Sequence, residues 1–94
     1  MYRVQDRWGN SIELTNERWD YVRYWHPDLA DHLDEILATI KKGRRRQDSL
    51  DPTKYTYYRR TDALLPEYTH IIVIVRLVRN NFVVTAYPKS ILEK

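Results

Sequence analysis

His26 is the residue in this chain best placed to do acid–base chemistry. It stands with Pro27 between two segments that both have a helical pattern. Proline is favoured at the first position of a helix, so we expect His26 at the N-cap, where the positive end of the helix disfavours a protonated ring. A neutral imidazole can accept a proton as a general base. The alternative is a turn histidine whose ring packs on Trp25 or Trp19.

Basic residues and tyrosines gather in the middle of the chain. "KKGRRR" at 41–46 places five cations in six positions, and "YYRR" follows at 57–60. A local basic patch indicates a polyanionic partner, and tyrosines beside arginines offer the stacking surfaces that single-stranded nucleic acid uses. A solvated charged loop and ordinary strand tyrosines are the alternatives. The candidate RNA-binding residues are Arg44, Arg46, Lys54, Tyr57, Arg59 and Arg76.

Two strands are predicted near the C-terminus, in "THIIVIVRLVRN" and "NFVVTAYP", with Asn80-Asn81 as a two-residue turn. Strand side chains alternate between faces, so this turn places three cross-strand pairs on one face. These pairs are Arg76 with Thr85, Ile74 with Tyr87, and Val78 with Val83. The other face is apolar, with Ile71, Val73, Val75, Leu77, Phe82, Val84 and Ala86, and we expect the helices to cover it.

The remaining elements follow from local patterns. Residues 2–7 and 11–14 flank "GN" and predict a short hairpin. Thr15 or Asn16 can cap a first helix, and an apolar stripe predicts a second helix that ends at Gly43. This stripe contains Leu29, Leu33, Ile36, Leu37 and Ile40. Residues 44–50 and 54–60 are expected to be extended, separated by "DPT".

The predicted fold is α+β. Two N-terminal helices pack on one face of a roughly four-stranded antiparallel sheet, preceded by the hairpin, and the sheet's other face is partly polar and open. At 94 residues the chain, 1–94, is expected to be a single domain.

The open face could carry a metal-independent RNase site. Such a site needs a base for the 2′-hydroxyl, a donor at the leaving oxygen and groups that stabilise the phosphorane. His26, Tyr87 with Thr85, and the arginines could fill these roles. From residues 44–48, either Arg44, Arg46 and Asp48 or Arg45 and Gln47 would join them, depending on which residues face the site. Each also has a structural alternative: an ordinary cross-strand pair for Thr85, the core edge for Tyr87, and neutralisation of arginines for Asp48.

Other classes of function find little support. The chain has no cysteine and only two glycines, which argues against thiolate chemistry and phosphate-cradling glycine loops. The acidic residues of 28–35 are expected to form a solvated face, so we predict no metal and no cofactor. No apolar run is long enough to span a membrane, and the polar start "MYRVQDRWGN" is unlike a signal peptide. We therefore expect a cytoplasmic protein without a membrane partner.

Five segments, in this order, carry a resemblance to a known family: "WHPDL", "LDEILATI", "RRRQD", "YTYYRR" and "FVVTAYP". Over about residues 12–88 the chain resembles phage and bacterial members of the barnase–EndoU–colicin–RelE superfamily, which are small metal-independent RNases often found as toxins. The resemblance implies helices behind a four-stranded sheet, RNA on the open face, and an acidic antitoxin as a partner. It also implies catalytic roles for His26, for a basic residue such as Arg45 with Asp48, for Tyr57 or Arg59, and for Thr85 with Tyr87.

Three hypotheses therefore remain at this stage. The first is an endoribonuclease that makes a 2′,3′-cyclic phosphate. The second is a non-catalytic RNA-binding module that uses the same basic and aromatic surface. The third is a family member whose sheet face binds a protein partner.

Overall fold

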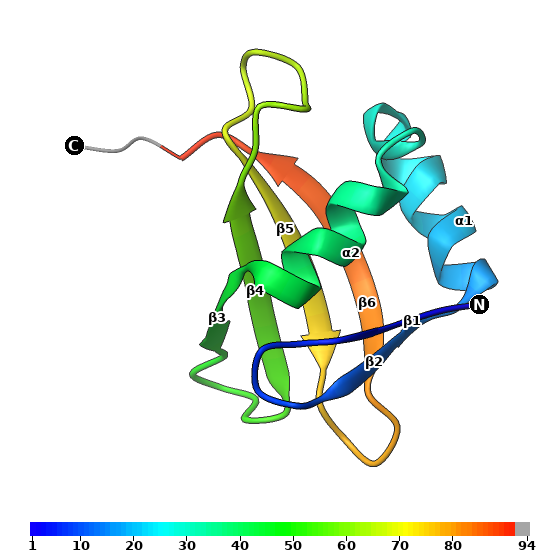
Figure 1. The fold of residues 1–94 in the computed structure, drawn as a ribbon, viewed down its shortest axis with the longest axis vertical. Helices are drawn as coiled ribbons and strands as arrows, with labels where there is room; N and C mark the ends of the chain where they lie inside the picture. The colour runs from blue at the N-terminus through cyan, green and yellow to red at the C-terminus, as the bar shows by residue number, and fades with distance from the viewer. Residues whose placement is uncertain (92–94) are drawn as a thin grey trace.

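The computed structural model describes residues 1–91. Its elements, shown in Figure 1, are β1 (Tyr2–Gln5), β2 (Ser11–Leu14), α1 (Asn16–Trp25), the 3₁₀ helix η1 (Pro27–Leu29), α2 (Leu33–Lys42), β3 (Arg44–Gln47), β4 (Lys54–Arg60), β5 (His70–Arg76) and β6 (Phe82–Lys89). The strands form one sheet in the order β1-β2-β6-β5-β4-β3. The predicted α+β class is confirmed.

The sheet has six strands and is mixed, so the expectation of about four antiparallel strands is wrong. The N-terminal hairpin does not precede the sheet but joins it, because β2 pairs with β6 in the parallel direction, with Glu13 opposite Phe82. The backbone N–H of Glu13 donates to the carbonyl of Asn81 at 3.0 Å, and the Asn81 side chain donates to the carbonyl of Ser11 at 3.1 Å. This pairing covers one end of the β6 edge, whose backbone groups would otherwise lack partners in the sheet.

Helix α1 begins as predicted, and the second helical segment begins later than predicted. Thr15 is the N-cap of α1, and its hydroxyl accepts a hydrogen bond from the backbone N–H of Arg18 at 3.1 Å. Pro27 does occupy a first helical position, but in η1, which has three residues, and α2 starts at Leu33. His26 therefore caps a single short turn, so the predicted effect of a long helix dipole on its ring does not apply.

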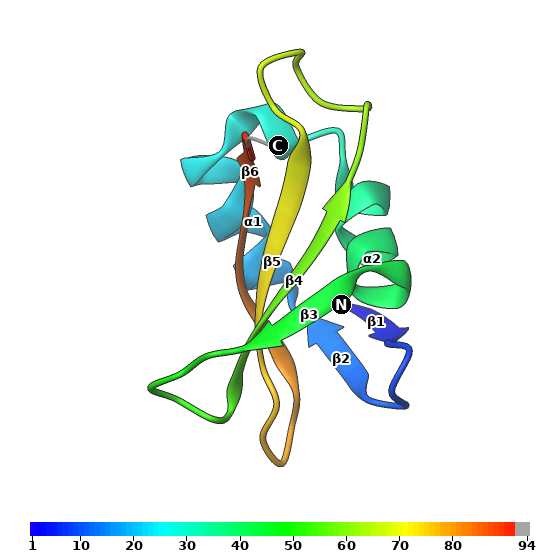
Figure 2. The same ribbon diagram turned by 90° about the vertical axis from the view of Figure 1, so that its left-hand side faces the viewer.

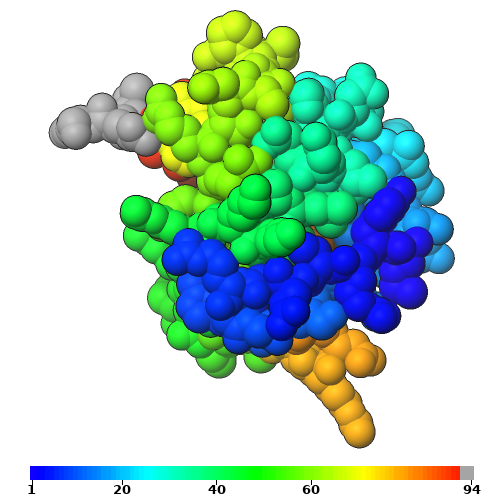
Figure 3. Space-filling model, in the orientation of Figure 1, coloured from blue at the N-terminus to red at the C-terminus, as the bar shows by residue number. Residues whose placement is uncertain are grey.

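The helices cover one face of the sheet. Figures 1 and 2 show α2 across β4 and β5 and α1 alongside β6. From the same side, the space-filling view in Figure 3 shows the hairpin lying next to α2 over the strands. None of the helices in residues 1–91 is long and apolar enough to cross a membrane.

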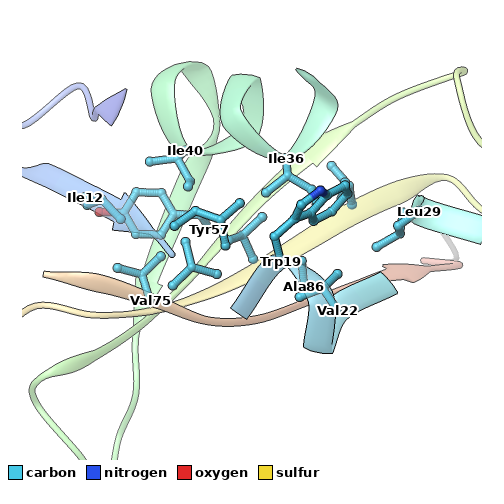
Figure 4. Close-up of a cluster of buried hydrophobic side chains, with 13 residues drawn as sticks. Ile12, Trp19, Val22, Leu29, Ile36, Ile40, Tyr57, Val75 and Ala86 are labelled. Atoms are coloured by element: carbon cyan, nitrogen blue, oxygen red, sulfur yellow. The ribbon is translucent and has the colours of Figure 1, made fainter. Parts of the chain in front are cut away.

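One hydrophobic core lies between this helical layer and the sheet (Figure 4). Its side chains come from the hairpin, both helices, η1 and β4 to β6: Ile12, Leu14, Trp19, Val22, Leu29, Ile36, Ile40, Tyr57, Ile71, Val73, Val75, Val83 and Ala86. Ile36 and Ile40 are one turn apart on α2 and fully buried, as the predicted stripe requires.

The predicted register between the last two strands is wrong, by two residues at Thr85 and Tyr87 and by three at Arg76, which pairs with Phe82 and not with Thr85. The structure pairs Ile72 with Tyr87 and Ile74 with Thr85. The connection is longer than the predicted two-residue turn, because β5 already ends at Arg76 and β6 starts at Phe82. Since their shift is an even number of residues, Thr85 and Tyr87 still point to the open face.

A β-bulge explains why Val83 and Val84 lie on the faces opposite to those predicted. Opposite Ile74 and Val75, β6 carries one extra residue, Val84, between Thr85 and Val83. The bulge reverses the alternation beyond this point. Val83 is therefore buried in the core, whereas Val84, predicted on the core face, is half-buried.

Gly43 connects α2 to β3 and leaves no room for a side chain. A Cβ on this residue would lie 2.4 Å from the carbonyl oxygen of Thr39 and 2.7 Å from that of Tyr58. The end of α2 can approach β4 this closely only because the residue is glycine.

We predict that Gly43→Ala lowers the free energy of unfolding by about 1–3 kcal/mol, because the backbone of α2 or β4 must move to admit the methyl group. Urea unfolding followed by circular dichroism measures this. Ser49→Ala, in an exposed loop, is the control and is expected to unfold as the wild type does. Equal midpoints for the Gly43 variant and the wild type would show that this approach is not tight.

Candidate nucleic-acid interface

The alternation of β4 decides which basic residues reach the open face. Tyr57 is fully buried on the helix side, so its neighbours in sequence point the other way. The pairing of Arg44 with Tyr58 and of Arg46 with Thr56 carries the same alternation into β3. The open face of these two strands thus carries Arg44, Arg46, Lys54, Thr56, Tyr58 and Arg60. Of the two alternatives that the sequence left open, the one with Arg44 and Arg46 is correct.

A groove of about 700 Å³, here called the central groove, lies on this open face. The buried side chain of Ile72 lies under it, and Tyr58 and Tyr87 contribute aromatic rings from β4 and β6. Arg46 and Lys89 add positive charge from β3 and β6, and none of the described residues that line the groove carries a carboxylate. It is therefore a cationic and aromatic surface without acidic competitors.

His26 reaches this surface from the helical layer. Its ring centroid lies 6.1 Å from that of Tyr87, with the planes tilted by 37°. Helix α1, which ends directly before His26, is held against β6, and the Arg18 guanidinium lies 3.5 Å from the carbonyl oxygen of Val84. His26 is half-buried, so part of its ring remains accessible to a ligand.

Three of the five predicted catalytic residues come together in this way: His26, Thr85 and Tyr87. Thr85 and Tyr87 are two positions apart on the same side of β6, a rise of about 7 Å. A histidine, a phenol and a hydroxyl can together accept, donate and orient protons around a phosphodiester.

The structure places Asp48, the fourth predicted residue, away from this group. Asp48 follows β3 and lies four residues from Arg44, which is in the same row across the sheet as Tyr87. An offset of about 13 Å along the strands and about 14 Å across them puts Asp48 roughly 19 Å from Tyr87. Its carboxylate accepts the backbone N–H groups of Leu50 at 2.8 Å and Asp51 at 3.0 Å. These hydrogen bonds hold the pKa of Asp48 below its ordinary value. Asp48 thus shapes the turn between β3 and β4.

Arg45, the fifth, lies on the helix side in a network around Asp6. The Tyr57 hydroxyl donates to the buried Asp6 carboxylate, and an Arg45 Nη lies 3.4 Å from both of these groups. The Arg45 guanidinium also lies between two rings, 4.1 Å from the centroid of Trp8 and 4.6 Å from that of Tyr55.

This network has consequences for both titrating groups. Burial raises the pKa of Asp6, but hydrogen bonds from Tyr57 and Asn10 and from the backbone of Trp8 outweigh it, so the pKa lies below its ordinary value. Burial, together with the hydrogen bond to Asp6, raises the pKa of Tyr57 far above its ordinary value. Asp6 is therefore ionised and Tyr57 neutral at pH 7. Their arrangement ties the hairpin loop to β4.

The six candidate RNA-binding residues divide between the two faces. Arg44, Arg46 and Lys54 lie on the open face. Tyr57 is in the core, and Arg59 forms an ion pair with Glu35 of α2, to which Thr61 also donates at 3.2 Å. Arg76 lies 2.6 Å from Asp51 in the loop before β4. The carboxylates of Glu35 and Asp51 offset the charges of these two arginines.

The predicted set also missed Tyr58 and Lys89. The sequence did indicate the face on which each of them lies, because residues two apart on a strand share a face. Lys89 follows Tyr87 by two positions, and Tyr58 belongs to the alternating set that contains Lys54. The run "YTYYRR" has tyrosines in both sets, so the sequence alone could not choose between them.

Comparison with protein-family models, with characterised proteins and with solved structures gives no match for this chain. Within residues 1–91, no three histidine, aspartate or glutamate side chains come together in an arrangement that could hold a metal ion.

We predict that Tyr57→Phe lowers the free energy of unfolding by about 1–3 kcal/mol at pH 7, because a buried carboxylate loses a donor. The pKa of Asp6 is lowered in the fold, so its contribution is present above the ordinary value of 3.8 and is lost as pH falls through the folded value. The penalty should therefore shrink toward about pH 2. Urea unfolding at both pH values measures it.

Tyr55→Phe is the matched control, because the Tyr55 ring lies beside the same Arg45. Its penalty should be smaller and should not change with pH. A Tyr57→Phe penalty at pH 7 no larger than that of Tyr55→Phe would show that the Asp6 carboxylate does not depend on the Tyr57 hydroxyl.

Proposed function

We propose that the protein is a metal-independent endoribonuclease that binds single-stranded RNA across the open face of its sheet. The central groove supports RNA as the ligand, since Arg46 and Lys89 can bind phosphates and the rings of Tyr58 and Tyr87 can stack on bases. Bases in single strands are free to stack in this way, whereas those in a duplex are not.

The observation that carries the proposal is the meeting of His26 with Tyr87 beside this groove. In the proposed reaction His26 takes the proton from a 2′-hydroxyl, whose oxygen attacks the adjacent phosphorus. The bond from phosphorus to the 5′-oxygen breaks, and Tyr87 donates a proton to that leaving oxygen. Lys89, two residues from Tyr87 on the same strand, offsets the charge of the phosphorane, and Arg46 binds a neighbouring phosphate of the RNA. The products are a 2′,3′-cyclic phosphate and a 5′-hydroxyl.

The resemblance to the barnase–EndoU–colicin–RelE superfamily also supports this proposal. Helices behind a sheet and a ligand on the open face are what that resemblance implies, and a RelE- or barnase-like fold would place RNA over Tyr87. A toxin role, with an acidic antitoxin that covers the cationic face, fits the charge of the central groove. We expect the site of action to be the cytoplasm, where mRNA and tRNA are found.

We predict that the purified protein cleaves a mixed tRNA and mRNA pool in the presence of EDTA and leaves 2′,3′-cyclic phosphate ends. His26→Ala is expected to lower the rate by about 10²–10⁴-fold, which is typical for the loss of a general base. Mapping the 3′ ends of the fragments measures both results. His32→Ala, which removes a histidine at the start of α2, is the control and should cleave as the wild type does.

Intact RNA with all three proteins would contradict the nuclease proposal. If gel shifts then showed equal binding by all of them, the protein would be a non-catalytic RNA-binding module. Cleavage that the His26 variant retains would exclude His26 as the base.

A second prediction tests the groove independently of cleavage. With a single-stranded oligoribonucleotide in the His26→Ala background, Arg46→Ala should reduce the slope of log K against log salt by about 0.7, the value for one lost phosphate contact. Fluorescence anisotropy at several salt concentrations measures the slope. Arg79→Ala removes an exposed cation from the β5–β6 loop as the control. Equal slopes for the two variants would exclude Arg46 as a phosphate contact.

A further inference from the structure

A second groove, here called the edge groove, lies where β3 begins and β4 ends, and its volume is about 540 Å³. Six basic side chains line it: Arg7, Lys42, Arg44, Arg59, Arg60 and His70. They come from the hairpin loop, the end of α2 and three different strands. No described residue that lines this groove has a carboxylate.

The fold brings these basic side chains together by specific contacts. Arg7 Nη1 donates to the backbone carbonyl oxygen of Lys42 at 3.4 Å, which holds the hairpin loop at the end of α2. Gly43 then turns the chain tightly against β4 and places Lys42 and Arg44 on either side of the turn. Arg7, Lys42 and Arg44 are exposed, and within residues 1–91 no carboxylate forms an ion pair with any of them.

The two grooves adjoin each other. Tyr58 and Ile91 line both the edge groove and the central groove. From β3 to β6 the sheet crosses three strand spacings, about 14 Å, so one extended ligand can contact Arg44 at one end and Tyr87 at the other.

We propose that the edge groove is a phosphate-binding subsite that holds the same RNA strand at a distance from the His26–Tyr87 pair. This inference rests on the proposed function and extends it: the substrate is a single strand of several nucleotides, bound in two places. Arg7, Lys42 and Arg44, with which no carboxylate of residues 1–91 forms an ion pair, favour a phosphate, either an internal phosphodiester or a terminal phosphate.

The test measures RNA binding in the His26→Ala background, so that cleavage does not interfere. The double variant Arg7→Ala/Lys42→Ala should bind an oligoribonucleotide of about ten residues, within the range of single-strand sites, roughly tenfold more weakly. Its salt slope should fall by about 1.4, the value for two phosphate contacts. Lys42→Ala alone leaves the acceptor for Arg7 in place and should give about half of this change in slope.

The matched control is Lys41→Ala/Arg79→Ala, which removes the same charge from two exposed positions outside both grooves. It should bind as the His26→Ala parent does. A dinucleoside monophosphate, too short to span both grooves, should bind equally to the parent and to both double variants. Oligonucleotides with and without a terminal phosphate show which kind of phosphate the edge groove binds. A tenfold loss of affinity in the Arg7→Ala/Lys42→Ala variant for both oligonucleotides indicates an internal phosphodiester. A loss for the phosphorylated oligonucleotide alone indicates a terminal phosphate.

The possible failures are distinguishable. If both double variants weakened RNA binding equally, net charge alone would explain the effect. That result would overturn the subsite proposal but would not contradict the proposal that the wild-type protein cleaves RNA. A tenfold loss specific to the Arg7/Lys42 variant would support the subsite even if no cyclic-phosphate ends were found. An absence of RNA binding in the parent would overturn both proposals.

Discussion

The hydrogen bond from the Tyr57 hydroxyl to the buried Asp6 carboxylate determines which surface this molecule presents. It holds the Tyr57 side chain on the helix side of β4. Because side chains alternate along a strand, the orientation of this one residue determines the face on which every other residue of β4 lies. Lys54, Tyr58 and Arg60 must then lie on the open face, as must Arg44 and Arg46 through pairing with β3. A slip of one residue would bury the cations and expose the tyrosine and its carboxylate partner.

The acidic partners of the basic residues are distributed with the same asymmetry. Arg45 lies near Asp6, and Arg59 pairs with Glu35, both on the helix side. Arg76, at the end of β5, pairs with Asp51 in the loop between β3 and β4. Among the described residues that line the central and edge grooves, none carries a carboxylate. A mild overall charge of +3 is thereby concentrated where an RNA strand can bind.

Local signals predicted much of the fold. Thr15, Gly43 and the apolar stripe from Leu33 to Ile40 act through short-range sterics and hydrogen bonds, and the structure has them as expected. Leu29, predicted in the same stripe, lies in η1 instead. The position of Thr85 and Tyr87 on one face also followed from alternation. The register of β6 did not, because the connection from β5 to β6 is longer than the two-residue turn that Asn80-Asn81 predicts. The extra residue at Val84 was also invisible in an alternating apolar run. The role of Arg45 was equally hidden, since its contacts with Asp6 and Trp8 join segments nearly forty residues apart.

RNA is proposed to lie on the open face and at its β3 edge, and not across the outer surface of the helices. Chemical-shift perturbation of the ¹⁵N-labelled His26→Ala protein by a single-stranded oligoribonucleotide tests this claim residue by residue. If RNA binds there, the amide signals of Arg46, Tyr58, Tyr87 and Lys89 shift on addition of the oligoribonucleotide. The signals of Asp34 and Ala38 on α2 do not shift. Shifts confined to α2 and the hairpin, or no shifts at all, would contradict it.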